Sequence, residues 1–141
     1  MTLSVGPTSD IAVCAALRRT VFIEEQGVPE AVEQDGRDVG AHHILAMLKG
    51  VPVGCARILT EDATGKIGRV CVLRPQRGHG VGAALVTACL DHMHTLPGLT
   101  RAALGAQTYA LGLYEKLGFV AYGAEFSDAG GQPHQMMERA L

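Results

Sequence analysis

The spacing of apolar residues changes several times along this chain and predicts a mixture of strands and helices. Residues 11–22 carry apolar side chains at helical spacing, directly after a polar run that can cap a helix. Residues 43–48, 53–59 and 66–73 alternate as strands do, and Lys49-Gly50 predicts a hairpin between the first two. An amphipathic helix is predicted over residues 81–94.

Weaker signals complete this pattern. Short strands are predicted over residues 2–5, 101–106, 119–122 and 134–141, and a short helix over residues 109–117 that ends at Gly118. The acidic residues 30–40 predict one helical turn followed by a loop. This order of elements predicts an α/β protein with a mixed (α+β) sheet and helices on both faces. Residues 1–141 are expected to form a single domain.

The junction between the strand over residues 66–73 and the following helix is the most informative segment. It reads Arg77-Gly78-His79-Gly80-Val81-Gly82-Ala83, so glycines occupy the turn from strand to helix. The first amides of a helix have no intrahelical partner and lie at the positive end of its dipole, which favours an anion. Arg77 adds positive charge at the rim. The segment predicts a diphosphate site, although a tight turn without a ligand also uses glycines.

Composition and charge exclude several other classes. A hydrophobic content of 48% indicates a globular protein, and a net charge of −2 without a basic cluster gives no attraction for nucleic acid. No apolar run reaches the roughly 18 residues of a membrane span, and the first seventeen residues contain no Lys or Arg. We therefore expect neither a membrane segment nor a secretory signal.

The cysteines and histidines predict no metal site. Four scattered cysteines without a C-x-x-C pair indicate buried, reduced thiols in a cytoplasmic protein. His92 and His94 are two residues apart and point to nearly opposite faces of their helix, and His42 and His43 alternate across a strand. Neither pair can easily share a metal ion.

Two motifs give the chain a resemblance to a known family. Arg77, Gly80 and Gly82 fit the pattern Gln/Arg-x-x-Gly-x-Gly/Ala, and a second pattern, Tyr-x-Lys-x-Gly-Phe, is matched by Tyr114, Lys116, Gly118 and Phe119. In this order and separation the motifs resemble those of the GNAT superfamily of acyl-CoA-dependent N-acetyltransferases, across nearly the whole chain. The run VFIEEQGVP over residues 21–29, with the acidic residues after it, is similar to the ElaA-like branch.

The resemblance implies the fold, the reaction and a cofactor site. The fold is a central, mostly antiparallel sheet with helices on both faces. The reaction is transfer of an acetyl group from acetyl-CoA to a primary amine of a small molecule or peptide, directly within a ternary complex. Main-chain groups would bind the pantetheine arm as an added strand does, at Cys71, Val72 and Leu73. Main-chain amides of the glycine turn would bind the diphosphate, at Arg77, Gly78, His79, Gly80, Val81, Gly82 and Ala83. Gln107 stands where relatives often place an Asn that contacts coenzyme A.

This reaction needs a proton donor and a base. A phenol with a pKa near ~10 can protonate a departing thiolate when the two are close, and Tyr114 matches the family's general acid. At pH 7, removing a proton from an alkylammonium costs about 4–5 kcal/mol. The glutamate that often serves as base before the glycine turn is absent, because residues 66–70 contain no carboxylate. Glu25 and His43 are the alternative bases, acting directly or through water, although both are also explained as structural residues.

The acceptor and the oligomeric state stay open. Six carboxylates between Glu24 and Asp38 would attract a cationic amine, or form a solvated acidic loop. Arg57 and Arg69 could instead bind a carboxylate of the acceptor. Amines, polyamines, amino acids and peptides are all compatible with these residues, and so is a homodimer.

Two other functions fit part of the sequence. Gly78-x-Gly80-x-x-Ala83 also fits a dinucleotide-binding fingerprint, but the predicted meander before it and the lack of an acid over residues 96–106 argue against this. A non-catalytic acyl-CoA-binding module of the same fold is the second alternative. Tyr114 argues against it, because such a module needs no general acid.

Overall fold

The computed structural model describes residues 2–128 and 131–141, and within them seven strands form one sheet in the order β1-β2-β3-β4-β5-β7-β6. The first antiparallel set is β1 (Leu3–Thr8), β2 (His42–Leu48), β3 (Val51–Glu61) and β4 (Thr64–Val72). The second is β5 (Arg101–Gln107), β7 (Pro133–Ala140) and β6 (Val120–Ser127). Among these strands only β4 and β5 pair in parallel. The predicted mixed, mostly antiparallel sheet is confirmed.

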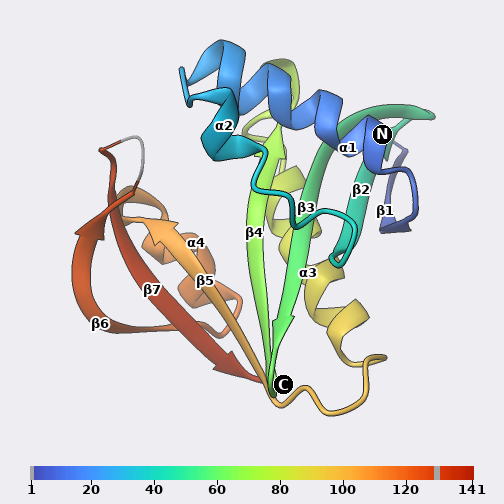
Figure 1. The fold of residues 1–141 in the computed structure, drawn as a ribbon. Coiled ribbons are helices and arrows are strands. Elements are labelled where there is room, and N and C mark those ends of the chain that lie inside the picture. Colours follow the sequence, from blue (N-terminus) through green and yellow to red (C-terminus); the bar gives the residue numbers. More distant parts are fainter. Residues whose placement is uncertain (1, 129–130) are drawn as a thin grey trace.

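Helices cover both faces of the sheet, as predicted (Figure 1). On one face lies α1 (Ile11–Arg18), where Asp10 Oδ1 accepts a hydrogen bond from the Val13 amide at 3.2 Å. It continues as the π-helical segment η1 (Arg19–Glu25), and α2 (Glu30–Glu33) follows. The other face carries α3 (Val81–Met93) and α4 (Leu111–Lys116), each preceded by a 3₁₀ turn: η2 (Arg74–Gln76) and η3 (Thr108–Ala110).

Two apolar clusters hold these layers together. The larger lies between the sheet and α3 and includes Ile44, Ile58, Leu85 and Met137, each fully buried. The smaller lies under α1 and contains Cys14, Leu17, Val21, Cys55 and Cys71. All four cysteines of the chain are free and buried, as the sequence predicts. The rigid β3–β4 pair, packed on both faces, therefore forms a fixed support for the segment that follows β4.

The most important irregularity is a bulge in β4. The pairing of β3 with β4 shifts between Cys55 and Arg57, and Arg69 opposite this shift has a φ of 51°. Beyond Ile67 and Leu104 the parallel pairing of β4 with β5 also stops, although both strands continue. Figure 1 shows the two strands diverging from this point. The sheet consequently has a gap on one side of the last residues of β4.

Several element boundaries differ from the sequence prediction. β1 runs through Gly6 and Pro7 instead of ending before them, which is acceptable because β1 is an edge strand. β6 extends to Ser127 rather than to residue 122, and α4 begins at Leu111 after the 3₁₀ turn η3 rather than at residue 109. The predicted turn over residues 127–133 lies partly outside the described residues.

Candidate active site

The glycine turn has the geometry that an anion site needs. Gly78 and Gly80 have φ values of 81° and 83°, a region that residues with a side chain rarely adopt, and Gly80 is the N-cap of α3. A Cβ atom added at Gly78, Gly80 or Gly82 would meet no atom within 4 Å. No side chain caps the helix, and its first turn closes with the Ala84 amide on the Gly80 carbonyl at 3.0 Å. The preceding amides of α3 are left for an external acceptor.

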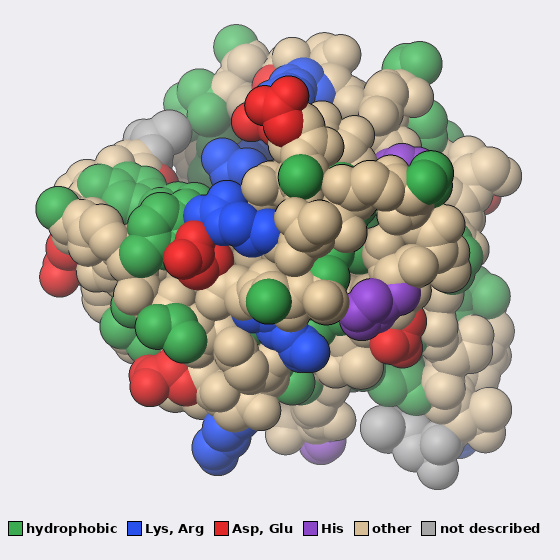
Figure 2. All heavy atoms as spheres, turned by 90° about the horizontal axis from the view of Figure 1, so that it is seen from below, with side chains coloured by type: hydrophobic (Ala, Val, Ile, Leu, Met, Phe, Trp, Pro, Cys, Tyr) green, Lys and Arg blue, Asp and Glu red, His purple; other side chains and the backbone are tan. Residues whose placement is uncertain are grey.

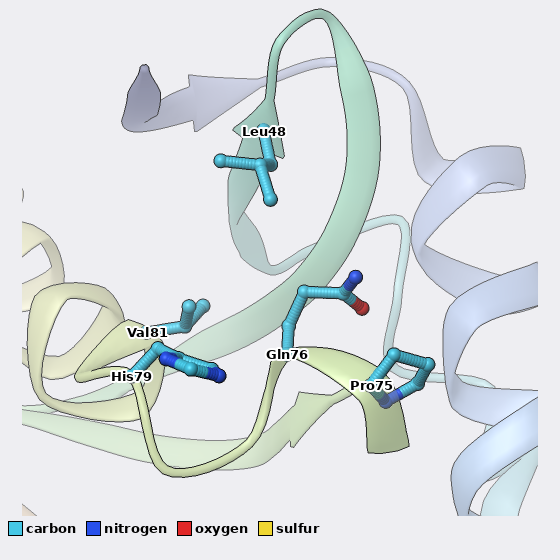
Figure 3. Close-up of a pocket in the computed structure, with 5 residues that line it drawn as sticks. All are labelled: Leu48, Pro75, Gln76, His79 and Val81. Atoms are coloured by element: carbon cyan, nitrogen blue, oxygen red, sulfur yellow. The ribbon is translucent and has the colours of Figure 1, made fainter. Parts of the chain in front are cut away.

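A small cavity adjoins this turn (Figure 3). It has a volume of about 130 Å³ and is lined by Leu48, Pro75, Gln76, His79 and Val81. His79 and Val81 come from the turn and α3, and Leu48 from the end of β2. Gln76 Oε1 is buried and has no hydrogen-bond partner among the described residues. The turn is therefore bordered by open space, and one residue of the cavity lining carries an unsatisfied acceptor.

The end of β4 presents its main chain in two directions. The Leu73 amide donates to the Val53 carbonyl at 2.8 Å, so this group faces β3. The Val72 carbonyl instead accepts from Arg77 Nε at 2.9 Å. Val72 and Cys71 lie opposite Gly54 and Cys55 of β3, and hydrogen-bonded and non-hydrogen-bonded pairs alternate in an antiparallel ladder. The Leu73–Val53 bond therefore leaves the Val72 main chain facing the gap beside β4. Of the three predicted pantetheine contacts, Val72 is the best placed.

Arg77, next to the glycine turn, and Glu25, at the end of η1, form a bidentate ion pair. The distance from Nη1 to Oε2 is 2.5 Å and that from Nη2 to Oε1 is 2.9 Å. Arg74 approaches the same carboxylate at 3.7 Å. The hydrogen bond from Arg77, reinforced by the charges of both arginines, lowers the pKa of Glu25. While this pair persists, Glu25 is a weaker base than an ordinary glutamate.

Tyr114 lies on α4 with its ring partly buried against the larger core. It meets Phe119 edge to face, with ring centroids 6.3 Å apart. Burial, with a smaller effect of Tyr109, raises the pKa of Tyr114. The phenol therefore keeps its proton at neutral pH, as a general acid must. Gln107, the last residue of β5, is half-buried and lies opposite His134 on β7.

His43 is almost completely buried. It is 4% exposed, and its Nε2 lies 2.8 Å from the Asp38 carbonyl. Its Nδ1 is buried without a hydrogen-bond partner among the described residues. Because a carbonyl only accepts hydrogen bonds, Nε2 carries the proton in this contact and Nδ1 bears the lone pair. Use of His43 as a base would require water to reach Nδ1.

Most carboxylates of the acidic segment pair with arginines from other parts of the chain. Asp38 accepts two hydrogen bonds from Arg18 at 2.9 Å and one from Arg57 at 3.0 Å. Asp35 binds Arg57 through both oxygens at 2.8 and 2.9 Å. Burial acts to raise the pKa of Asp38, but the hydrogen bonds from Arg18 and Arg57 outweigh it. The hydrogen bond from Arg57 lowers the pKa of Asp35, so both pKa values lie below their usual range. Most of the negative charge of the segment is therefore paired, although residues 34–37, 39 and 40 are exposed, and both terminal nitrogens of Arg57 are already bound to aspartates.

The same network extends to the bulge of β4. Glu33, only 3% exposed, lies 2.5 Å from Arg18 and 3.6 Å from Arg69. Arg69 also donates to the main-chain carbonyls of Val32 and Glu33, at 3.2 and 3.3 Å. Sequence reasoning missed Arg18 and the bulge. The only signals were an arginine on the apolar side of a predicted helix and a glycine, Gly68, inside a predicted strand.

The face seen in Figure 2 carries charges of both signs without a large field of either. Hydrophobic side chains gather on the side that holds β6 and β7, and exposed apolar residues of β6 are Val120, Tyr122 and Phe126. Residues 2–128 and 131–141 contain no group of three side chains able to hold a metal ion. No helix within these residues is long and apolar enough to cross a membrane.

Comparison with known proteins identifies the class to which this fold and site belong. Residues 8–141 match the family described as "Acetyltransferase (GNAT) domain", so the chain belongs to the GNAT acetyltransferase family. Because the described sheet has a single parallel pair and not a series of parallel βα units, the dinucleotide-binding alternative does not describe this chain.

One relative in sequence and two solved structures show how similar this chain is to other proteins of this class. A Bacillus subtilis (strain 168) protein named as an acetyltransferase is 38% identical over 133 residues, which is 92% of this chain and 89% of the relative. The crystal structure of Escherichia coli ElaA is similar with a TM-score of 0.83 and 29% identity, covering 98% of each chain. A GNAT family acetyltransferase from Elizabethkingia anophelis, with acetyl-CoA bound, shares the fold at a TM-score of 0.75 and 16% identity, covering 99% of this chain and 98% of that one.

Proposed function

We propose that this acetyl-CoA-dependent acetyltransferase acetylates a primary amine of a small molecule or peptide, by direct transfer in a ternary complex. The observation that carries the proposal is the uncapped, open glycine turn at the start of α3, beside the gap between β4 and β5. Amides of Gly80 to Ala83 would hold the diphosphate, with further contacts from Arg77, Gly78 and His79. The Val72 main chain would pair with the pantetheine arm, and Gln107 would line its other side.

Tyr114 is the proposed general acid. The raised pKa of Tyr114 keeps its phenol protonated. Tyr114 lies on α4, which follows β5, on the side of the gap opposite to Val72. In the reaction its hydroxyl would donate a proton to the thiolate as the carbon–sulfur bond of the thioester breaks, while the amine nitrogen bonds to the carbonyl carbon. The phenolate would then regain a proton from water.

The base stays a choice between Glu25 and His43, each acting through water. Glu25 becomes available only when Arg77 releases it, and His43 only when water reaches Nδ1. The variants Glu25→Gln and His43→Gln separate them. The one that removes the base should abolish the acidic limb of the pH–rate profile, and the other should leave that limb in place.

The test of the proposed function is a screen of amines with acetyl-CoA, measured as release of free thiol. For the best acceptor, Tyr114→Phe should lower kcat about 10²-fold or more while leaving the Kd for acetyl-CoA nearly unchanged. Tyr109→Phe is the matched control, because Tyr109 is 86% exposed on the adjacent 3₁₀ turn. Unchanged turnover in Tyr114→Phe would remove this residue from the mechanism.

The alternative is a non-catalytic acyl-CoA-binding module. It predicts that acetyl-CoA raises the melting temperature of the protein, as any ligand of the folded state does, without thiol release on any amine.

We also propose that the protein is cytoplasmic and forms a homodimer. Light scattering of the wild type and of Val120→Lys would test whether two copies associate through the apolar face of β6.

A further inference from the structure

Glu25 occupies an unusual position for a surface carboxylate. It is the last residue of η1, where the Gln26 amide bonds to the Val21 carbonyl at 3.1 Å and the helix widens. Its side chain is 22% exposed, and both oxygens bind the guanidinium of Arg77, which is 52 residues away in the sequence. The contact joins the end of the first helical segment to the glycine turn.

Arg77 also uses its Nε donor on the site itself. Its Nε donates to the Val72 carbonyl at 2.9 Å, the main-chain group that faces the gap beside β4. The guanidinium therefore lies across the path proposed for the pantetheine arm. At 38% exposure it is free to turn toward the glycine turn once its contacts are broken, because an ion pair this exposed is weak.

We infer that, in the free protein, the Glu25 carboxylate binds Arg77 at the position where the cofactor's diphosphate would otherwise bind it. Binding of acetyl-CoA then moves Arg77 from Glu25 to the diphosphate. This inference rests on the proposed function, because it assumes that the diphosphate lies at the glycine turn. Carboxylate and phosphate both accept the planar fork of a guanidinium through two oxygens, so a single arginine can serve either. Glu25 is thus a positioning residue: it determines where Arg77 lies and how strongly the turn attracts a diphosphate.

The exchange requires contacts of Arg77 to break, and it favours ligands that carry phosphate. The Arg77–Glu25 and Arg77–Val72 contacts must break before Arg77 reaches the diphosphate, and the freed carboxylate then repels the incoming negative charge. Only a ligand that carries phosphate gains Arg77 in return. Removing the carboxylate should therefore strengthen binding of coenzyme A more than binding of its pantetheine portion.

The experiment compares Glu25→Gln with Glu30→Gln by calorimetry. Glu30 is a matched control, since it is exposed, pairs with Arg19 and loses the same charge, but does not contact the glycine turn. For Glu25→Gln we expect the Kd of coenzyme A to fall about 2- to 5-fold, the range of an exposed ion pair, with a smaller effect at high salt. The Kd of S-acetylpantetheine should fall by less, because this ligand also displaces Arg77 from Val72 but offers it no phosphate. Glu30→Gln should change neither value by more than about 1.5-fold.

A double-mutant cycle tests whether the effect acts through the arginine. Arg77→Met should weaken binding of coenzyme A, and adding Glu25→Gln to it should give a smaller gain than in the wild-type background. The inference is wrong if Glu25→Gln leaves coenzyme A binding unchanged or weakens it, or if it strengthens S-acetylpantetheine binding equally. A wild-type protein that binds neither coenzyme A nor acetyl-CoA would instead overturn the proposed function, and this inference with it.

Discussion

Removal of one arginine from the buried ionic network should severely destabilise the protein. Arg18 is 1% exposed and donates three hydrogen bonds, one to Glu33 and two to Asp38. In Arg18→Met the side-chain volume is approximately kept, but Glu33, itself 3% exposed, is left with only Arg69 at 3.6 Å among the cations near it. Leaving a buried charge without its partner costs about 3–5 kcal/mol of unfolding free energy.

The measurement is urea denaturation of the variant beside a neighbouring control. With an m-value of about 1–3 kcal/mol/M, the expected loss moves the midpoint down by at least about 1 M. Arg19→Met is the control, because Arg19 is 44% exposed in its ion pair with Glu30, and its loss should cost no more than about 1 kcal/mol. Equal effects of the two substitutions would refute the argument that the network, rather than helix propensity, supports this part of the fold.

Three further predictions follow from the site and its surroundings. The pKa values of Asp35 and Asp38 lie below the unfolded value of about 4, so the stability that these residues contribute is fully present above about pH 5 and is lost as the pH falls through their folded pKa values. Urea midpoints at pH 7, 5 and 3 would show this, and a midpoint independent of pH would contradict it. Gly80→Val forces a β-branched residue into a φ of 83° and fills the open turn, so calorimetry should find acetyl-CoA binding weakened about 10-fold or more, and wild-type affinity would argue against the turn as the diphosphate site. Burial raises the pKa of Cys89 to about 12, so this thiol should react with a disulfide reagent only after unfolding. Rapid labelling of Cys89 in the native protein, detected by mass spectrometry, would show that α3 opens readily.

The fold was predictable because its elements carry local signals. Alternation identified β2, β3 and β4, helical spacing identified α1 and α3, and Lys49-Gly50, both with positive φ, forms the predicted hairpin turn. The boundaries of β1 and β6 were less accurate. A strand at the edge of a sheet tolerates Gly6 and Pro7, and its position depends on neighbours that lie far away in the sequence.

The site was predictable only where it depends on main-chain geometry. The glycines that lead into α3 appear in the sequence because few other residues adopt their φ values. The partners of charged side chains have no such local signal. Nothing in the sequence near Glu25 indicates Arg77, and nothing near Asp38 indicates Arg18 and Arg57 together. These pairings arise from the way α1 crosses the sheet, which brings residues from distant segments within hydrogen-bond distance.

The short parallel ladder between Thr64–Ile67 and Arg101–Leu104 has a mechanical consequence. Within the described chain, it is the only strand pairing that joins the part of the sheet built from β1 to β4 to the part built from β5 to β7. A compound that contacts both β4 and β5 beyond the end of this ladder holds the two parts of the sheet together where no hydrogen bonds join them. Amide hydrogens of β5 should then exchange more slowly with solvent when such a compound is bound, including those far from any atom it touches.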